Sequence, residues 1–272
     1  MPDPRVFLIR HGETEWSLSG RHTGTTELPL TPNGESRIRA TGKALVGPDR
    51  LIVPGNLAHI YVSPRRRAQR TLELLDLGCR ERYPWEEAER EDHVGSGGAE
   101  ERNAKRERAD GLRTLAPIEI TEAVREWDYG EYEGETSRDI QAKRRDAGLP
   151  PWDIWSDGCP GGESPQDVTA RLDALISSIR EKFHVGRFGK GAGWKGADGT
   201  GPNDVLVVAH GHLLRAFAAR WVGRDLRDNP SLILEAGGVG TLSYEHGRVE
   251  EPAILLGGAF VVDVVEKEEG KK

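Results

Sequence analysis

The sequence has few cysteines and no long apolar run. Cys79 and Cys159 are the only cysteines among 272 residues, which excludes a disulfide framework and a cysteine-based zinc pattern. No apolar run approaches the roughly 20 residues that a membrane-spanning helix needs. The first thirty residues contain no signal-peptide core after a basic segment. We therefore expect a soluble, cytoplasmic protein without membrane association.

The chain also lacks an excess of positive charge. It has 38 lysines and arginines against 45 aspartates and glutamates, which gives a formal net charge of −7. Nucleic acid is therefore not expected as a partner, because general attraction to it requires a basic surface. An anionic ligand would have to be bound by a local basic cluster. The length suits one large domain with a sizeable core.

Four short apolar segments have the composition of buried strands, and helical patterns lie between them. The expected strands are Val6–Ile9, His59–Val62, Ile118–Thr121 and Val205–Ala209. A Ser or Thr cap followed by proline predicts helix starts at Thr31, Ser63 and Ser164. This alternation predicts an α/β fold, a three-layer αβα sandwich with a mostly parallel central sheet.

Two segments interrupt the alternation of strands and helices. We expect a single domain over residues 1–272, with a charged insertion at about 80–117 and a glycine-rich loop at about 186–204. Charged residues dominate the first segment and glycine recurs in the second, as in solvated and flexible segments. Neither segment is expected to carry chemistry.

Two of the expected strands end in a histidine followed by a glycine. Arg10 and His11 precede Gly12 after the first strand, and His210 precedes Gly211 after the last. Open α/β sheets bind ligands at the carboxyl ends of their strands. If the two strands are neighbours, the histidines should face each other, and both glycines should let a ligand approach the backbone. The alternative is a salt-bridging arginine beside a turn histidine.

The third segment that could bind a ligand or take part in a reaction is SPRRRAQRT, residues 63–71. Its arginines follow a strand and begin a helix, a place that suits phosphate because guanidinium forks and free backbone N–H groups match phosphate oxygens. The alternatives are a solvated helix face or a nucleic-acid contact. We expect one of these arginines to point inward.

The fourth segment is VREWDYGEYEG, residues 124–134, which is rich in acidic and aromatic residues. Most carboxylates lie on the surface of a protein. A carboxylate held near an anion site, however, would be able to act as a proton donor.

These segments in this order, together with CPGGES, resemble the histidine phosphatase superfamily, whose fold is shared with cofactor-dependent phosphoglycerate mutase. The likeness extends to the fungal sedoheptulose 1,7-bisphosphatase branch through PWDIWSDGCPGGES and LEAGGVGTLSYEHGRVEEPAI. The resemblance implies release of phosphate from a sugar bisphosphate through a phosphohistidine, with sedoheptulose 1,7-bisphosphate giving sedoheptulose 7-phosphate.

Several alternatives to this activity stay open. One is a phosphoglycerate mutase or a broad-specificity phosphomonoesterase of the same superfamily. Another is a non-catalytic module that binds phosphate or a protein. A homo-oligomer also stays open. No cofactor and no metal are expected, because arginines can neutralise a phosphoryl group as magnesium does elsewhere.

The resemblance also assigns roles to individual residues. It makes His11 the nucleophile, Arg10 and Arg67 the phosphate clamps, His210 a hydrogen-bond partner of the phosphate and Glu126 the proton donor, with Arg65 and Arg66 as second choices after Arg67. The further substrate contacts that it implies are His22, Thr23, Tyr129, Arg138, Arg215 and His246.

The chemistry of a histidine nucleophile adds two expectations. The ring of His11 must be neutral to attack, and neighbouring cations should lower its pKa. A backbone contact to the other ring nitrogen should aim the reacting one.

Overall fold

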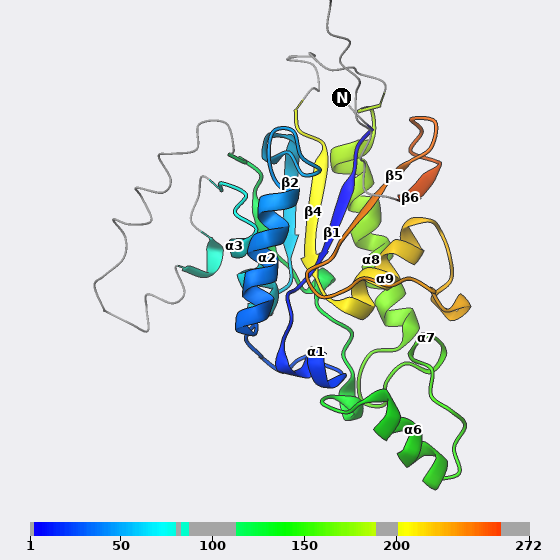
Figure 1. Cartoon of the computed structure of the whole chain (residues 1–272). Helices are drawn as coiled ribbons and strands as arrows, with labels where there is room; N and C mark the ends of the chain where they lie inside the picture. Colours follow the sequence, from blue (N-terminus) through cyan, green and yellow to red (C-terminus); the bar gives the residue numbers. More distant parts are fainter. Residues whose placement is uncertain (1–2, 80–82, 87–112, 189–200, 257–272) are drawn as a thin grey trace, which may run out of the picture.

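A six-stranded sheet forms the centre of the protein in the computed structural model, which describes residues 3–79, 83–86, 113–188 and 201–256 (Figure 1). The strand order is β3-β2-β4-β1-β5-β6. The strands are β1 (Val6–Arg10), β2 (Leu57–Val62), β3 (Ile118–Ile120), β4 (Asp204–Ala209), β5 (Val239–Tyr244) and β6 (Pro252–Leu255). Most of the predicted charged insertion and glycine-rich loop lie outside the described residues.

Helices connect and cover these strands. The α-helices are α1 (Glu15–Ser19), α2 (Pro32–Leu45), α3 (Arg66–Leu74), α6 (Ser137–Asp146), α7 (Ile154–Asp157), α8 (Pro165–Ile179) and α9 (Gly211–Trp221). Short 3₁₀ turns are η1 (Pro54–Asn56), η2 (Glu122–Val124), η3 (Gly130–Tyr132) and η5 (Leu226–Asp228), and a π-turn, η4 (Arg180–His184), continues α8.

The expected mostly parallel sheet is confirmed. β3, β2, β4 and β1 run parallel, with Val6 of β1 opposite Val205 of β4. β5 is antiparallel to both β1 and β6. Neither β5 nor β6 was predicted from the sequence. The four predicted strands thus form the parallel part of the sheet, and their carboxyl ends meet at one edge.

The sheet is covered on both faces, as the three-layer prediction requires. Along β1, Phe7 and Ile9 pack in a core cluster with residues of α2 and α3. Val6 and Leu8 point to the opposite face and join a cluster with residues of α8 and α9. Figure 1 shows the two pairs of helices on opposite sides of the strands. Buried parallel strands of this kind are apolar on both faces.

Two of the three predicted helix caps are confirmed. Thr31 caps α2 and Ser164 caps α8, each accepting a hydrogen bond from a backbone N–H of the first turn. The prediction for Ser63 is wrong, because α3 begins at Arg66 without a side-chain cap. The Ser63 hydroxyl instead lies 2.7 Å from Nε2 of His210, a partner that local sequence rules cannot show.

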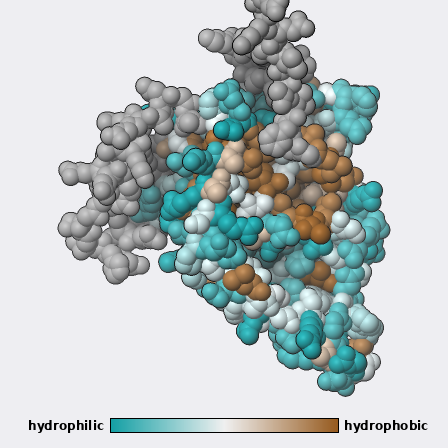
Figure 2. All heavy atoms as spheres, viewed as in Figure 1, coloured by the Kyte–Doolittle hydropathy of each residue, from teal (hydrophilic) through white to brown (hydrophobic). Residues whose placement is uncertain are grey.

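The face of the protein seen in Figure 2 carries both polar and apolar areas. Figure 2 shows mostly hydrophilic residues over α2 and α6, and hydrophobic residues gathered over the region of β1, β5 and β6. Within the described ranges, no helix combines the length and apolar character needed to cross a bilayer.

Candidate active site

The edge where the parallel strands end brings two histidines together. His11 directly follows β1 and His210 directly follows β4, and the His11 N–H donates a 2.9 Å hydrogen bond to the carbonyl of Ala209. Both side chains are buried. Their ring centroids lie 5.1 Å apart, with the rings inclined at 61°. The expectation that these two histidines face each other is therefore confirmed.

The ring of His11 is held in one orientation. Its Nδ1 lies 2.7 Å from the carbonyl oxygen of Gly12. A carbonyl can only accept, so Nδ1 carries the hydrogen and Nε2 keeps its lone pair. The expected backbone contact to the second ring nitrogen is thus present, and Nε2 is the atom available for attack.

Burial keeps His11 neutral. It lowers the pKa of the imidazole well below the usual range, and the positive charges of Arg67 and Arg10 lower that pKa further. The expected direction of the shift is correct, but the expected cause is incomplete, because loss of solvation exceeds the effect of the cations.

Arg10 is fixed beside this pair. Its guanidinium donates a 2.8 Å hydrogen bond from Nη1 to the carbonyl of Leu234, while its buried Nε has no partner among the described residues. A Cβ placed on Gly211 would lie 3.2 Å from Cζ of Arg10. The glycine therefore makes room for an arginine of the site, while the expectation that it also lets a ligand approach the backbone stays a prediction.

The first glycine is also closely packed against its neighbours. A Cβ on Gly12 would lie 3.0 Å from Cγ1 of Ile38 and 3.3 Å from the carbonyl oxygen of Gly34. The backbone N–H of Gly12 donates to the hydroxyl of Thr71 in α3 at 3.0 Å. Gly12 therefore packs closely against α2 and is anchored to α3, and this packing fixes the turn that holds His11.

Arg67 is the arginine of the third segment that points inward, as expected. Its side chain is fully buried and donates to the carbonyls of Thr23, Gly24 and Thr26 at 2.9–3.1 Å. Its Nε lies 3.3 Å from Nδ1 of His210. The loop that carries these carbonyls thus fixes the guanidinium against the histidine pair.

The neighbouring arginines lie further out. Arg70 pairs with carboxylates on the helix surface, and the side chain of Arg66 is exposed. Arg65 pairs with Glu27 through Nη1 at 3.3 Å, while its Nε is buried without a partner among the described residues. Its charge also helps to lower the pKa of His210. Arg65 is therefore near the site, and Arg66 is not directed into it.

His210 is neutral and bridges two polar groups. Burial lowers its pKa well below the usual range, and Arg67 and His11 add to the effect. Because Nε of Arg67 can only donate, Nδ1 of His210 accepts, and the hydrogen on Nε2 is directed to the Ser63 hydroxyl.

Glu126 belongs to the loop between η2 and η3, and its carboxyl contacts the N-terminus of α9. Its Oε1 accepts from the N–H groups of Trp127 and Leu213, both at 2.9 Å, and its Oε2 accepts from the N–H of His212 at 3.2 Å. Burial raises the pKa of the carboxyl, although these three N–H groups and the charge of Arg67 oppose the shift. Both acceptor positions of Oε1 are filled, so Oε2 is the oxygen with room for a proton.

A second polar group adjoins Glu126. The hydroxyl of Tyr129 and Nδ1 of His212 share a 2.7 Å hydrogen bond. The ring of His22 lies 4.8 Å from that of Tyr129 and 5.7 Å from that of His212. Two of the predicted contacts, His22 and Tyr129, are thus brought together. His212 was missed, although its position in the first turn of α9, two residues after His210, could have signalled it.

Arg215 joins the same region of the site. It follows His212 by one turn of α9, and its Cζ lies 4.9 Å above the ring of Trp155. Its Nη2 donates to the carbonyl of Pro230 at 3.3 Å, and its Nε is buried without a partner in the described ranges. Burial lowers its pKa, and the charge of Arg10 lowers it further.

The remaining predicted contacts differ in their placement. Thr23 contributes its backbone carbonyl to Arg67, while its hydroxyl turns to the carbonyl of Arg21. Arg138 is exposed on α6, one residue after Ser137, whose hydroxyl lies 3.1 Å from Nε2 of His22.

His246 is not brought to the site. β5 runs antiparallel to β1, so the turn that follows β5 lies at the edge of the sheet opposite His11. The side chain is largely exposed and pairs with Glu251 at 2.6 Å. The expectation of a substrate contact at His246 is therefore wrong for this fold, because strand direction, which the motif does not encode, decides its place.

In the part of the chain that the structure covers, no three His, Cys, Asp or Glu side chains are grouped so that they could hold a metal ion.

Comparison with known proteins agrees with this arrangement. The model of the histidine phosphatase superfamily (branch 1) matches residues 6–110 and 105–253. The sedoheptulose 1,7-bisphosphatase of Saccharomyces cerevisiae is 33% identical, over 95% of this chain and 94% of its own. An acid phosphatase of Mycobacterium tuberculosis is 31% identical, over 92% and 91%. A solved structure of an open reading frame product of Mycobacterium tuberculosis superposes with a TM-score of 0.61 at 27% identity, covering 93% of this chain and 96% of its own.

Proposed function

Because this chain belongs to branch 1 of the histidine phosphatase superfamily, we propose that it hydrolyses phosphate monoesters through a phosphohistidine formed on His11, without a metal ion. The observation that carries the proposal is the buried pair of neutral histidines, 5.1 Å apart, beside the guanidinium groups of Arg10 and Arg67. Such a group provides a nucleophile together with fixed positive charge for an anionic substrate.

In the first step, Nε2 of His11 attacks the phosphorus atom. The N–P bond forms as the ester P–O bond breaks, and the electron pair of that bond passes to the departing oxygen. This oxygen takes the proton from Oε2 of Glu126, whose pKa is raised by burial. Arg10 and Arg67 balance the charge of the phosphoryl oxygens while it redistributes.

In the second step, water releases the phosphate. Glu126, now ionised, accepts a proton from the water molecule that attacks the phosphorus. The N–P bond breaks, its electron pair returns to Nε2 of His11, and inorganic phosphate leaves. Glu126 is protonated again and is ready for the next substrate.

His210 can hydrogen-bond to the phosphoryl group only from its other tautomer. Donation from Nδ1 requires a hydrogen on that atom, which leaves Nε2 as an acceptor and requires the Arg67 Nε–H, which now faces Nδ1 at 3.3 Å, to turn away from it. The Ser63 hydroxyl, 2.7 Å from Nε2, can reverse its role and donate. We expect substrate binding to reverse this hydrogen bond.

The proposed substrate is sedoheptulose 1,7-bisphosphate, the compound in the name of the yeast relative. A second phosphate needs a second cation away from His11. Arg215, whose buried Nε lacks a partner among the described residues, is our choice for this role, and Arg138 on α6 is a further candidate. His22 and Tyr129, whose rings lie 4.8 Å apart, are our choice for hydrogen bonds to the sugar hydroxyls, because the charge of Glu126 also acts on Tyr129.

A phosphate-release screen tests the proposal. Purified protein is incubated with sugar monophosphates and bisphosphates in the presence of a chelator. Preferential release from sedoheptulose 1,7-bisphosphate supports the assignment, whereas a loss of activity with the chelator contradicts the metal-free mechanism. Isomerisation of 3-phosphoglycerate with a trace of 2,3-bisphosphoglycerate, without phosphate release, would instead indicate a mutase. Absence of any turnover would indicate a binding module.

A further inference from the structure

We propose that Glu163 and Arg171 are positioning residues that hold the loop carrying Glu126. The inference rests on the proposed function, because Glu126 needs accurate placement only if it transfers protons. Both residues contact the backbone of this loop and take no part in the chemical steps described above.

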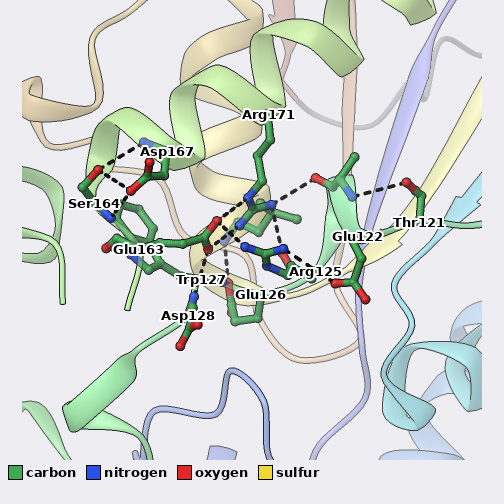
Figure 3. Close-up of polar contacts among 12 residues, drawn as sticks. Thr121, Glu122, Arg125, Glu126, Trp127, Asp128, Glu163, Ser164, Asp167 and Arg171 are labelled. Atoms are coloured by element: carbon green, nitrogen blue, oxygen red, sulfur yellow. Dashed lines mark hydrogen bonds and ion pairs between the residues drawn. The ribbon is translucent and has the colours of Figure 1, made fainter. Parts of the chain in front are cut away.

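Glu163 is a buried carboxylate with all of its acceptor positions used. Oε1 accepts from Nη2 of Arg125 and Nε of Arg171, both at 2.9 Å. Oε2 accepts from Nη2 of Arg171 and from the backbone N–H of Asp128, both at 3.0 Å. Figure 3 shows these contacts converging on Glu163. One carboxylate thus joins α8 to residues on both sides of Glu126.

The backbone of Glu163 strengthens the same connection. Its N–H donates to the carbonyl of Asp128 at 2.9 Å, and its carbonyl accepts from the indole N–H of Trp127, also at 2.9 Å. Asp128 is therefore paired with Glu163 through both its N–H and its carbonyl.

Arg171 adds a second attachment from α8. Its Nη1 donates to the carbonyls of Ala123 and Arg125, at 3.0 and 3.2 Å. The rest of its guanidinium forms the two-point pair with Glu163. A lysine can supply the charge at this position but not the planar set of donors that binds a carboxylate and two carbonyls together.

The loop needs such support because it has no regular structure of its own. Glu126 lies between η2, which ends at Val124, and η3, which begins at Gly130. The carboxyl of Glu126 contacts the N-terminus of α9 on one side, and Glu163 and Arg171 hold the backbone on the other. A displacement of about 1 Å in a reacting group can cost roughly a hundredfold in rate.

The test measures phosphoenzyme formation in a single turnover with two substrates. Sedoheptulose 1,7-bisphosphate has an alkoxide leaving group that needs the proton of Glu126. 4-Nitrophenyl phosphate has a leaving group that departs without one. For Glu163→Gln and Arg171→Lys we expect roughly a tenfold to hundredfold slower step with the sugar phosphate. With the aryl phosphate the rate should stay within about threefold, because that leaving group needs no general acid.

Glu126→Gln gives the reference pattern for loss of the general acid, a slower step with the sugar phosphate and a nearly unchanged step with the aryl phosphate. A second buried ion pair gives the control. Arg5 and Asp204 pair at 2.6 Å near the opposite edge of the sheet. Asp204→Asn should lower the melting temperature and change both rates equally. Arg125→Met provides a milder variant if Glu163→Gln does not fold, because Arg125 is partly exposed and binds the same carboxylate.

The outcomes separate the inference from the proposed function. If Glu163→Gln and Arg171→Lys slow both substrates equally, as Asp204→Asn does, the two residues are merely structural and the inference is overturned. If they retain wild-type rates with the sugar phosphate, the inference also falls, while the proposed function stands. If the wild-type protein forms no phosphoenzyme with either substrate, the proposed function itself fails.

Discussion

The hydrogen bond between Ser63 and His210 allows a prediction of defined size. Ser63→Ala removes the hydroxyl that lies 2.7 Å from Nε2 of His210, where both residues are completely buried. No water replaces a lost partner easily in such a place. When Nδ1 of His210 donates to the phosphoryl group, Nε2 needs the Ser63 hydroxyl as a donor, and we expect its loss to cost the transition state about 1 to 2 kcal/mol more than the free enzyme, so that kcat/KM falls roughly fivefold to thirtyfold.

The assay is steady-state phosphate release, accompanied by a melting temperature for each variant. Ser243→Ala is the matched control, because it removes a serine hydroxyl that donates to the carbonyl of Pro4 at 3.1 Å, toward the opposite edge of the sheet. It should leave kcat/KM unchanged. A folded Ser63→Ala protein with the kcat/KM of the wild type would refute the role of the hydroxyl as the partner of His210 Nε2 during the reaction.

Three further predictions concern the site and its surroundings. Gly211→Ala places a Cβ 3.2 Å from Cζ of Arg10, so the guanidinium must shift; we expect KM to rise several-fold, and an unchanged KM would show that Arg10 does not bind the phosphoryl group. His246→Ala should leave kcat/KM for sedoheptulose 1,7-bisphosphate unchanged, because the side chain lies at the far edge of the sheet; a large loss would restore it to the substrate site. The value of kcat/KM should stay high below the ordinary histidine pKa, because burial lowers the pKa of His11. It should decline as pH rises through the raised pKa of Glu126, because the general acid then loses its proton. A fall in kcat/KM on the acid side at the ordinary histidine value would contradict a neutral, buried nucleophile.

The parallel half of the fold could be predicted from the sequence because its strands are apolar on both faces. Val6–Arg10 and Asp204–Ala209 are short, buried and flanked by polar residues, so local composition identifies them. The strands Val239–Tyr244 and Pro252–Leu255 were missed, because β5 carries partly exposed small residues and β6 is an edge strand. Their antiparallel pairing is set by tertiary contacts rather than by a continuous apolar run.

The site was predictable where a motif fixes both residue and strand end. His11, Arg67 and His210 meet because each follows a parallel strand of the same sheet. His246 was misplaced because the direction of its strand depends on the whole sheet. The prediction of a helix start at Ser63 is wrong because the Ser63 hydroxyl forms a hydrogen bond with His210, a buried residue that is distant in sequence.

Burial is the factor that the sequence could not supply. The sequence shows that Arg10 and Arg67 are charged. The loss of solvation that chiefly lowers the pKa of His11, however, is a property of the packed structure. The same holds for Glu126, whose raised pKa comes from burial between the loop and α9.

The central claim is that the imidazole of His11 accepts the phosphoryl group on Nε2. Rapid quenching into alkali after mixing with sedoheptulose 1,7-bisphosphate and chelator, followed by phosphorus NMR and peptide mapping, tests it directly. The account predicts an Nε2-linked phosphohistidine at His11, which disappears in His11→Ala. Phosphate on Nδ1, on His210, or on no residue while the protein turns over would contradict it.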